Sequence, residues 1–568
     1  MGKYLDFKDA QCKDCYKCLR ACPVKAIDVT NHQAKIIDER CILCGTCTIV
    51  CPQNAKIVHS EKDNVKELIK NNSNVIASVA PSCISSFQIT DFSTMKIALG
   101  KLGFADAEET ALGAQLVVRE YAKLMETGQF KNFIVSACPA VCKMIQMYYP
   151  RALKYLAPVD SPMIAHAKLI KSKMPDAKIV FIGPCIAKKR EAEESHLIDG
   201  VLTFEDLNEM FAEKDIVLDD ILTLNMDNNA KHANLAKAFP ISHGIIQSFE
   251  KLPENYDYMS IDGADRCLDV LENIESISNV FIEMNVCKDA CVNGPCSLDK
   301  VGGSIKATSE IRDYVNREKK KLPIVEKIPE SPVDLSTNYE RLRVSGKIPT
   351  EKEIAEILAK IGKTKPEDEL NCGTCGYSTC REKAWAVFNG YADIEVCLPY
   401  MQQRAESFSY EIIRNSPEGL IVLDFDMNIL EMNNHARKLL GVQNGFVKGQ
   451  PAVELFNPTD FMLALEKNQH LERKKVFIPA SKLYVDLSIS IIKEHRALFG
   501  IMKDVTDEAN YNEKLNSMRL ETLETTDKVI KKQMFIAQEI ASLLGETTAE
   551  TKIALLKLKQ MLKEEEEE

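Results

Sequence analysis

The stretch "FIVSACPAV", residues 133–141, is a hydrophobic run that stops abruptly at Ser136-Ala137-Cys138-Pro139. Because proline cannot continue a strand ladder, the run predicts a buried strand that ends by aiming one side chain into a cleft. Similar runs recur between residues 70 and 300, separated by helical stretches: "NVIASVAP", "KIVFIGPC" and "NVFIEMNVC". This alternation predicts α/β layers, with functional sites at the carboxyl ends of the strands.

Cysteines stand at the ends of these runs: Cys138, Cys185 and Cys287, with Cys291 one helical turn later. A free cysteine is often a buried core residue, but four of them at strand ends point to a site. The chain contains 20 cysteines in all. In a reducing compartment, so many thiols favour metal or redox chemistry over disulfides.

Length and charge exclude several classes of protein. A length of 568 residues predicts roughly three to five domains. The formal net charge of −11 gives no electrostatic reason to expect a nucleic acid as partner. The first residues, "MGKYLDFKDAQCK", have no apolar signal core, and no apolar run approaches about 18 residues, so no membrane segment is expected. The simplest prediction is a cytoplasmic protein.

Two cysteine runs with the same spacing occupy the first 60 residues, and a proline follows each. The spacing C-x2-C-x2-C-x3-C-P is typical of bacterial two-cluster ferredoxins, in which the fourth cysteine of each run ligates the other cluster. Zinc sites rarely show this duplicated pattern. We therefore expect a ferredoxin-like domain over residues 1–60, with one 4Fe-4S cluster on Cys12, Cys15, Cys18 and Cys51 (cluster one) and another on Cys41, Cys44, Cys47 and Cys22 (cluster two).

A third group of cysteines lies in "NCGTCGYSTCREKAWAV", with Cys372, Cys375 and Cys380, and Cys397 follows. The glycines let the backbone turn tightly round a cluster, and the helical run after Cys380 would bring Cys397 to the fourth corner. The group resembles the small single-cluster iron-sulfur domain of several anaerobic redox proteins. We expect such a domain over residues 366–400, after a linker over 331–365, and a zinc site is the alternative.

Three motifs carry a family resemblance: "VSACP" (135–139), "GPCIAKKRE" (183–191) and "EMNVCKDAC" (283–291). They resemble the Thr-Ser-Cys-Cys-Pro, Met-Pro-Cys-x-x-Lys-Lys-x-Glu and Glu-x-Met-x-Cys-x-x-x-Cys motifs of FeFe-hydrogenases. The resemblance implies that residues 61–330 form the two-lobed α/β catalytic domain of that family.

The resemblance also implies a set of active-site residues and a cofactor. A 4Fe-4S cluster would be held by four cysteines, and the last of them, Cys291, would bridge to a two-iron unit carrying CO, cyanide and a dithiolate. Lys188 matches the lysine that pairs with one cyanide, which is sensible for an ammonium in a low-dielectric pocket. The other matching positions are Cys138, Cys185 and Cys287 as ligands, Ala80, Pro81 and Ser82 beside the second cyanide, and Glu191 at the close of the second motif.

The departures from the family pattern concern proton transfer. Ala137 stands where the family has the cysteine that passes protons to the two-iron unit, and a methyl group cannot transfer a proton. Val117 and Ala157 stand at the relay glutamate and the relay serine, whereas Glu120 keeps the second glutamate. Methionine positions of the second and third motifs are filled by Gly183 and Asn285. We therefore expect a protein that retains the cofactor pocket, lacks a continuous proton relay and turns over hydrogen slowly.

The carboxyl-terminal third resembles a signalling module. "SPEGLIVLDFDMNILEMNNHARKLLG" and the later strand runs resemble a PAS domain, expected over residues 401–508. A haem bound by His435, His470 or His495 is an alternative use of this domain. Residues 509–568 have apolar positions at three- and four-residue spacing, which predicts helices in a signalling coiled coil or, alternatively, packed on the PAS domain.

The combined prediction is a multidomain α+β and α/β protein that acts as a slow, hydrogen-sensing FeFe-hydrogenase. Expected partners are H2 and protons, a redox partner such as ferredoxin, maturation proteins for the two-iron unit, an unidentified downstream signalling protein and a second copy of the chain. One alternative is a metabolic ferredoxin-linked hydrogenase, which the broken relay disfavours. Another is an iron-sulfur scaffold or assembly protein without the two-iron unit, which Lys188 and the intact second motif disfavour.

Overall fold

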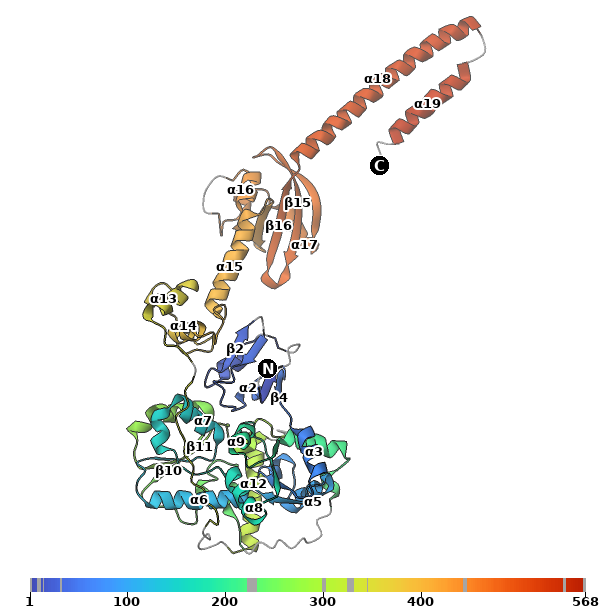
Figure 1. Cartoon of the computed structure of the whole chain (residues 1–568). Helices are drawn as coiled ribbons and strands as arrows, with labels where there is room; N and C mark the ends of the chain where they lie inside the picture. The colour runs from blue at the N-terminus through green and yellow to red at the C-terminus, as the bar shows by residue number, and fades with distance from the viewer. Residues whose placement is uncertain are drawn as a thin grey trace. The chain divides into compact units, whose positions relative to one another are not determined.

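The computed structural model describes residues 3–7, 12–13, 15–30, 33–221, 232–298, 303–323, 331–344, 346–442, 447–544 and 548–564. The chain divides into two compact units, Met1–Met401 and Gln402–Glu568 (Figure 1). Both units combine helices with sheets, which confirms the predicted multidomain α+β and α/β class. Over the residues described, no helix is long and apolar enough to cross a membrane.

The amino-terminal part of the first unit is ferredoxin-like. Each cysteine run contains a short helix that starts after a residue with positive φ, Tyr16 at 55° and Gly45 at 73°. Glycine adopts such angles freely, and a Cβ at Gly45 would also overlap the side chain of Pro295. The elements are α1 (Lys17–Ala21), α2 (Thr46–Ile49), the antiparallel pair β1 (Leu5–Phe7) and β4 (Lys56–Val58), and the hairpin of β2 (Ile27–Thr30) and β3 (Gln33–Ile36).

Two parallel sheets form the two lobes of the domain predicted over residues 61–330. One has the strand order β6-β5-β8-β9 and the other β10-β11-β7. Strands β5 and β11 are buried along their whole length, as expected where helices cover both faces of a parallel sheet. The strands are β5 (Val75–Val79), β6 (Asp106–Glu109), β7 (Phe133–Ile134), β8 (Lys178–Ile182), β9 (Gly200–Leu202), β10 (Asp257–Asp262) and β11 (Val280–Asn285).

Helices surround these two sheets, and the cores of the lobes lie between the helices and the strands. They are α3 (Lys62–Asn71), α4 (Cys83–Ser86), α5 (Phe92–Leu102), α6 (Ala111–Glu126), α7 (Pro139–Tyr148), α8 (Pro162–Lys173), α9 (Ala187–Ser195), α10 (Phe204–Glu213), α11 (Ala264–Asn273) and α12 (Gly303–Lys321).

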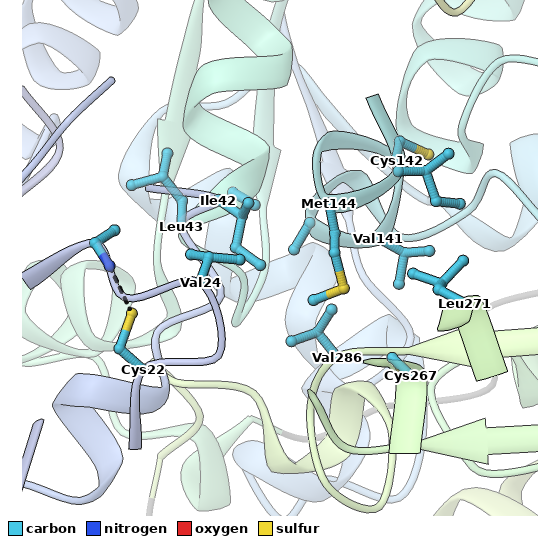
Figure 2. Packing of buried hydrophobic residues seen from close by; sticks show 14 of the residues in the cluster. Cys22, Val24, Ile42, Leu43, Val141, Cys142, Met144, Cys267, Leu271 and Val286 are labelled. Carbon is cyan, nitrogen blue, oxygen red and sulfur yellow. Dashed lines mark hydrogen bonds between the residues drawn. The ribbon is translucent and has the colours of Figure 1, made fainter. Parts of the chain in front are cut away.

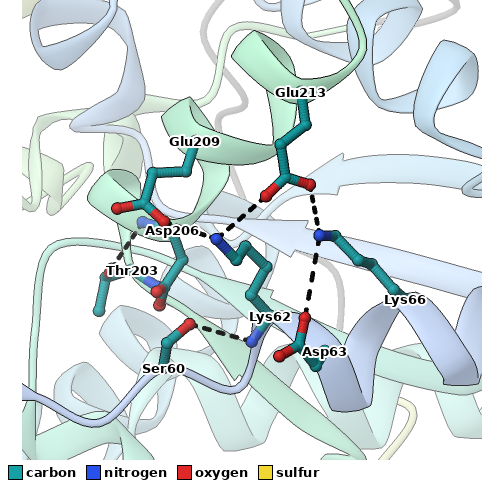
Figure 3. Close-up of polar contacts among 8 residues, drawn as sticks. All are labelled: Ser60, Lys62, Asp63, Lys66, Thr203, Asp206, Glu209 and Glu213. Atoms are coloured by element: carbon teal, nitrogen blue, oxygen red, sulfur yellow. Dashed lines mark hydrogen bonds and ion pairs between the residues drawn. The ribbon is translucent and has the colours of Figure 1, made fainter.

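Ion pairs join helix α3 to helix α10 in the four-stranded lobe (Figure 3). Lys62 Nζ lies 2.6 Å from Glu209 Oε2 and 3.1 Å from Glu213 Oε1, and Lys66 also pairs with Glu213. Exposed pairs of this kind contribute less than about 1 kcal/mol each. Their main effect is therefore to orient α3, the helix that follows the ferredoxin-like part.

A shared hydrophobic core joins the ferredoxin-like part to the three-stranded lobe (Figure 2). Ile42 and Leu43, from the second cysteine run, lie in one buried cluster with Met144 of α7 and Val286, which follows β11. Because this cluster is continuous, the second cysteine run is held directly beside the lobe that carries Cys138.

The third cysteine group lies in a small helical domain with α13 (Glu351–Lys360) and α14 (Cys380–Phe388). Leu358 and Ile361 pack against Ala384 and Cys397 in one buried cluster. The segment predicted as a linker, 331–365, thus contains a helix that belongs to this small domain. The expectation of a linker did not account for the apolar face of α13, which needs a packing partner.

The second unit has a five-stranded antiparallel sheet with the order β13-β12-β16-β15-β14, the arrangement of a PAS fold. A Cβ at Gly500 would overlap the ring of Phe461, so the absent side chain lets α17 pack closely on the sheet. The elements are α15 (Leu398–Asn415), β12 (Gly419–Asp424), β13 (Ile429–Met432), α16 (Asn434–Leu440), α17 (Thr459–Lys467), β14 (Leu471–Ile478), β15 (Leu483–Ile492), β16 (Ala497–Asp504), α18 (Thr506–Leu544) and α19 (Thr548–Glu564).

The three histidines considered for haem lie outside the core of this domain: His470 and His495 are exposed and His435 is half-buried.

The carboxyl-terminal segment is helical, as predicted, and an ion pair of 2.5 Å between Lys559 and Asp527 joins α19 to α18.

Candidate functional site

A cavity lies where strands of both lobes end. Its walls come from the segments that follow β5, β6, β7 and β8 and from the last residue of β11. This is the place that the strand runs predict for a site in an α/β fold. Eight predicted site residues line it, together with Pro184, which precedes Cys185 in the second motif. The eight are Ala80, Pro81, Ser82, Ala137, Cys185, Lys188, Asn285 and Cys291.

The four strand-end cysteines lie together at one side of this cavity. Burial, together with the neighbouring Cys138 thiol, raises the pKa of Cys185 to about 11. Burial also raises the pKa of Cys287 and of Cys291 above the ordinary value, and in both cases Cys138 and Cys185 add to the effect. Crowded thiols of this kind deprotonate when a metal cluster supplies the compensating positive charge.

The four thiols match the donor set of an iron-sulfur cluster. A 4Fe-4S cluster takes four cysteine thiolates, one for each of its four irons. The residues present therefore fit a cluster.

Ser82 presents a buried hydroxyl to the cavity. Its side chain is 0% exposed, and Oγ has no hydrogen-bond partner among the described residues. An unsatisfied buried hydroxyl costs about 1–3 kcal/mol, so such groups are normally paired. A bound group with a hydrogen-bond acceptor would remove this cost, which is the chemistry that cyanide offers.

Lys188 places a positive charge at the cavity wall. Its Nζ donates to Ser161 Oγ at 2.9 Å and to Glu191 Oε2 at 2.6 Å. The ammonium and Glu191 are mostly buried, so their attraction is only weakly screened by solvent. Glu191 thus orients Lys188, and the ammonium remains within the wall of a cavity that suits an anionic ligand.

The positions at which the family resemblance implies a proton relay are apolar in the structure. Val117 and Ala157 are 0% exposed and share one hydrophobic cluster, against which Ala137 packs. Glu120 forms an ion pair of 2.9 Å with Lys123. Proton transfer through Ala137, Val117 and Ala157 has no titratable group to use.

Asn285 joins the cavity wall to a carboxylate behind it. Its Nδ2 donates to Asp262 Oδ1 at 3.1 Å, and Ser242 donates to the other oxygen of Asp262. Cys267 Sγ lies 3.3 Å from the carbonyl of Asn285 and donates to it. These contacts fix the side chain that stands at the family's methionine position.

Glu283, the first residue of the third motif, is held as a buried carboxyl. Its Oε2 accepts from the backbone N–H groups of Ile245 and Ile246, both at 3.0 Å, and Oε1 has no partner among the described residues. Burial raises the pKa of Glu283 to about 8. The group is therefore mostly neutral at pH 7 in the folded chain and ionised in the unfolded chain.

This pKa predicts a pH-dependent stability. Because the pKa of Glu283 is higher in the folded chain than in the unfolded chain, its contribution to the free energy of unfolding is fully present below the unfolded pKa of ~4.3. This contribution falls as the pH rises toward 8, by about 1.36 kcal/mol for each pH unit between the two pKa values. We expect Glu283→Gln to lose less thermal stability than wild type between pH 5 and pH 9, as checked by calorimetry. The exposed Glu254→Gln should follow wild type, and equal slopes for all three proteins would contradict the assignment.

The cysteines predicted for cluster one line a second, smaller cavity. Lys56 also lies at this cavity, 3.1 Å from the centre of the Phe7 ring. The four predicted ligands all belong to the lining: Cys12, Cys15, Cys18 and Cys51. The structure thus brings together two runs that are far apart in sequence, in the exchanged pattern that the spacing predicts.

The cysteines predicted for cluster two are buried together between the ferredoxin-like part and the lobes. Burial raises the pKa of Cys41 to about 12, and Cys44 and Cys22 contribute to this. Burial raises the pKa of Cys44 to about 11, with contributions from Cys22 and from Cys138. Burial raises the pKa of Cys47 as well, and Cys44, Cys41 and Cys22 add to the effect. The four thiols are therefore neighbours, and Cys44 lies near the strand-end cysteine Cys138.

The accessory cysteines lie round Lys383. Burial lowers the pKa of Lys383, while Cys375, Cys397 and Cys380 oppose that effect. The pKa of Cys375 in turn is raised by burial and by Cys397 and Cys372. The structure therefore brings all four predicted ligands of the third cluster together.

This accessory group contacts the ferredoxin-like part beside cluster two. Gly376 approaches Leu19 so closely that a Cβ would lie 3.0 Å from its side chain, and Tyr377 is near enough to both Cys375 and Cys22 for each thiol to raise its pKa, after the larger effect of burial. Arg40, next to Cys41 in the chain, has its guanidinium over the Trp385 ring at 5.2 Å and over the Tyr391 ring at 4.9 Å. Cation–π contacts of this kind stabilise by about 0.5–2 kcal/mol.

The structure also contains residues that the sequence left without a role. Cys142 Sγ donates to the carbonyl of Ser136, and Cys267 bonds as described above, so these thiols serve packing and hydrogen bonding. Cys83 and Cys296 are fully buried. Thr110 and Phe239 line the cavity and were not predicted; the signal for Thr110 was its place directly after the β6 run.

A substitution in the accessory group tests the cluster count. We expect wild type to bind about 18 irons in four 4Fe-4S clusters and a two-iron unit. Cys372→Ser should remove about four of these, because a serine hydroxyl is a poor substitute for a thiolate, and should leave the infrared bands of the active site unchanged. Iron analysis and electron paramagnetic resonance check the first result. Loss of the infrared bands would contradict the separation of the two sites.

Family models match four parts of the chain. They are "4Fe-4S dicluster domain" over residues 11–55, "Iron only hydrogenase large subunit, C-terminal domain" over 73–295, "Putative Fe-S cluster" over 368–399 and "PAS fold" over 408–483. The matches confirm the resemblance carried by the three motifs.

Curated relatives of the chain include hydrogenases. The chain is 25% identical over 385 residues to iron hydrogenase 1 of Clostridium pasteurianum, covering 53% of this chain and 67% of that protein. It is 26% identical to the periplasmic [Fe] hydrogenase large subunit of Nitratidesulfovibrio vulgaris, covering 32% of this chain and 50% of the relative. A solved [FeFe]-hydrogenase, 17% identical with a TM-score of 0.41, covers 50% of this chain and 99% of that structure. Residues 73–295 thus match the model of the iron-only hydrogenase large subunit, on a chain that also matches the models of a 4Fe-4S dicluster domain and a PAS fold.

Proposed function

We propose that this chain is a slow, hydrogen-sensing FeFe-hydrogenase that interconverts H2 with two protons and two electrons and passes its redox state to a PAS module. The supporting observation is the contrast between the lining of the cavity and the relay positions, of which Ala137 lines the cavity while Val117 and Ala157 lie in the hydrophobic cluster next to it. Cys291, Lys188 and the unpaired Ser82 hydroxyl are present as a cofactor pocket, whereas the relay positions are apolar. A pocket that holds the cofactor but transfers protons poorly suits detection better than fast turnover.

The bound two-iron unit would supply the hydrogen chemistry itself. In the proposal, Cys138, Cys185, Cys287 and Cys291 hold the 4Fe-4S cluster, and Cys291 bridges to the two-iron unit. Lys188 and Ser82 donate to its cyanide ligands, while Glu191 keeps the ammonium in place. Ala80, Pro81, Ala137 and Asn285 shape the remaining wall, whose apolar surface keeps water out.

Electrons would leave the site through cluster two. Cys44 is close enough to Cys138 to feel its thiol electrostatically, and Tyr377 is similarly close to Cys22 and Cys375. Cluster two would therefore exchange electrons with the active site, with cluster one and with the accessory cluster. A ferredoxin-like carrier is the proposed external redox partner, and maturation proteins would deliver the two-iron unit inside the cytoplasm.

The PAS domain and helices α18 and α19 would carry the signal onward. Exposed apolar side chains on α18, such as Met518, Val529 and Ile536, offer a face for a second copy of the chain or for a downstream signalling protein. In the same proposal, this unit has no part in the hydrogen chemistry, because every proposed metal ligand lies in the first unit.

Truncation tests that division. A chain ending at Met401, the boundary between the two compact units, should keep hydrogen oxidation with an artificial electron acceptor and should lose any output that depends on the PAS domain. Activity is measured on matured, folded protein with the full-length chain as control. A truncated chain that keeps its clusters but loses hydrogen oxidation would contradict the signalling assignment.

Infrared spectroscopy of the matured full-length protein tests the proposal itself. Bands from CO and cyanide are expected, together with hydrogen oxidation far slower than that of a metabolic hydrogenase. Their absence after maturation would favour an iron-sulfur scaffold, and fast turnover would favour a metabolic ferredoxin-linked hydrogenase.

A further inference from the structure

A chain of four polar residues leads from the cavity wall to a partly exposed carboxylate in the four-stranded lobe. Thr110 lines the cavity, and its Oγ1 lies 2.9 Å from Ser78 Oγ. Ser78 Oγ lies 2.8 Å from His166 Nδ1, and His166 Nε2 lies 3.0 Å from Glu108 Oε2. Every link is within hydrogen-bond distance.

The fold holds these residues in line. Ser78 and Glu108 are register partners in the parallel pair β5–β6, and Thr110 directly follows β6. His166 reaches them from α8, which packs closely on α6 because a Cβ at Gly113 would overlap the backbone of His166. The contacts therefore depend on strand register and on a helix–helix approach that only glycine permits.

Burying this series of hydrogen-bonded polar residues costs free energy that a purely structural role would not require. Ser78 and His166 are buried, His166 at 0% exposure, in a lobe whose neighbouring positions are apolar. Polar groups in such a place cost free energy unless every one is paired, and apolar residues of similar size would avoid that cost. The side chain of Glu108, by contrast, is 23% exposed, so the Glu108 end of this hydrogen-bonded series reaches solvent.

We propose that Thr110, Ser78, His166 and Glu108 form a proton relay between the cavity and solvent. The relay lies in the four-stranded lobe, whereas the apolar positions Val117 and Ala157 belong to the core of the three-stranded lobe. It would carry protons for the cavity, which those apolar side chains cannot do. This inference rests on the proposed hydrogenase function, because it needs a reaction in the cavity that releases or consumes protons.

One proton moves outward in five linked transfers. A proton from the cavity binds Thr110 Oγ1 while the hydroxyl proton of Thr110 passes to Ser78, and the hydroxyl proton of Ser78 passes to His166 Nδ1. The imidazole then gives its Nε2 proton to Glu108, which releases it to water. No electron moves, and one proton leaves the cavity. Rotation of both hydroxyls and tautomer exchange of His166 reset the relay for the next proton.

Charges near the outer end keep Glu108 ionised and favour release of a proton from Glu108 to water. The hydrogen bond from His166 lowers the pKa of Glu108, and Lys173 and Lys96 contribute to the lowering. Lys96 is itself paired with Asp106 at 2.6 Å. Glu108 therefore stays ionised as an acceptor for His166. Two neutral hydroxyls must reorient for each proton, so the relay works more slowly than one built on carboxyl groups.

The test separates proton transfer from structure by following the matured protein after a rapid pH change. The rate at which the infrared band pattern reaches its new equilibrium is the readout, alongside the solvent isotope effect on hydrogen oxidation. Ser78→Ala removes the central oxygen and should slow this relaxation about tenfold or more, with the final band positions unchanged. Ser248→Ala is the matched control, since Ser248 is equally buried and bonds only backbone carbonyls.

Glu108 provides the variant that is safe for folding, because its side chain is partly exposed. Glu108→Gln should slow relaxation to a similar degree and shift the pH profile, and Glu108→Asp should recover part of the rate. Relaxation at the wild-type rate in Ser78→Ala or Glu108→Gln would overturn the relay, as would altered final band positions at an unchanged rate. Absence of CO and cyanide bands in wild type would instead overturn the hydrogenase proposal, so the two failures are distinguishable.

Discussion

A chain with Cys291→Ala should mature without CO and cyanide infrared bands and without detectable hydrogen oxidation. Cys291 lines the cavity and also lies among the other strand-end thiols, so it is placed to connect a 4Fe-4S cluster with a group in the cavity. A methyl group cannot ligate iron, and Cys185 is the one other thiol among the described residues that line the cavity. Infrared spectra and hydrogen-oxidation assays of the matured variant measure the loss.

Cys296→Ala is the control for this prediction. Cys296 lies shortly after Cys291 in the chain, is fully buried and has no assigned ligand role. Its removal should cost about 1 kcal/mol of stability, as core substitutions commonly do, and should leave the bands in place. Retained bands in Cys291→Ala, or lost bands in a folded Cys296→Ala chain, would show that the ligand set is misassigned.

Introducing the three relay groups that the family resemblance implies should raise the hydrogen-oxidation rate in steps. Ala137→Cys returns a thiol to the cavity wall, and Val117→Glu and Ala157→Ser return the next two groups. The single thiol should give partial recovery because a relay is limited by its slowest gap. The triple variant should gain about a hundredfold or more, with non-additive effects, since the three groups act as one unit.

The cost of this restoration follows from burial. Val117 is fully enclosed in an apolar cluster, so a carboxyl there destabilises by a few kcal/mol unless it finds a partner. Turnover and infrared redox titrations under hydrogen measure the gain, and Ala140→Cys, buried on α7 and outside the cavity lining, is the control. If wild type already turns over as fast as a metabolic hydrogenase, the broken relay is not what limits this protein.

The positions of the strand-end cysteines could be predicted because strand runs and parallel sheets obey simple rules. The runs before Cys138 and Cys185 do end at the cavity, as carboxyl ends of parallel strands should. The length of β7 could not be predicted: the apolar run continues, but the strand stops at Ile134. Ser136 draws the chain away from the sheet, since its N–H donates to Tyr121 Oη and its Oγ donates to the Val159 carbonyl.

Other features depend on contacts between distant segments, which spacing along the chain does not reveal. The accessory group lies beside cluster two because Gly376 meets Leu19, and nothing in either segment alone indicates this. The same holds for His166 and Glu108, which meet across 58 positions only when α8 packs on α6. Local pattern predicts elements and ligand spacing, whereas the choice of neighbours is made by the whole fold.

The overlap that any side chain at Gly45 would cause with Pro295 limits how freely the domains can be exchanged. A ferredoxin-like part is easily pictured as a cassette that can be fitted to different catalytic domains. Here its second loop and the loop after Cys291 meet with no room for even a methyl group. A replacement cassette would need glycine at that position and the same loop geometry, so protein engineers should treat residues 1–60 and the two-lobed domain that follows as one part.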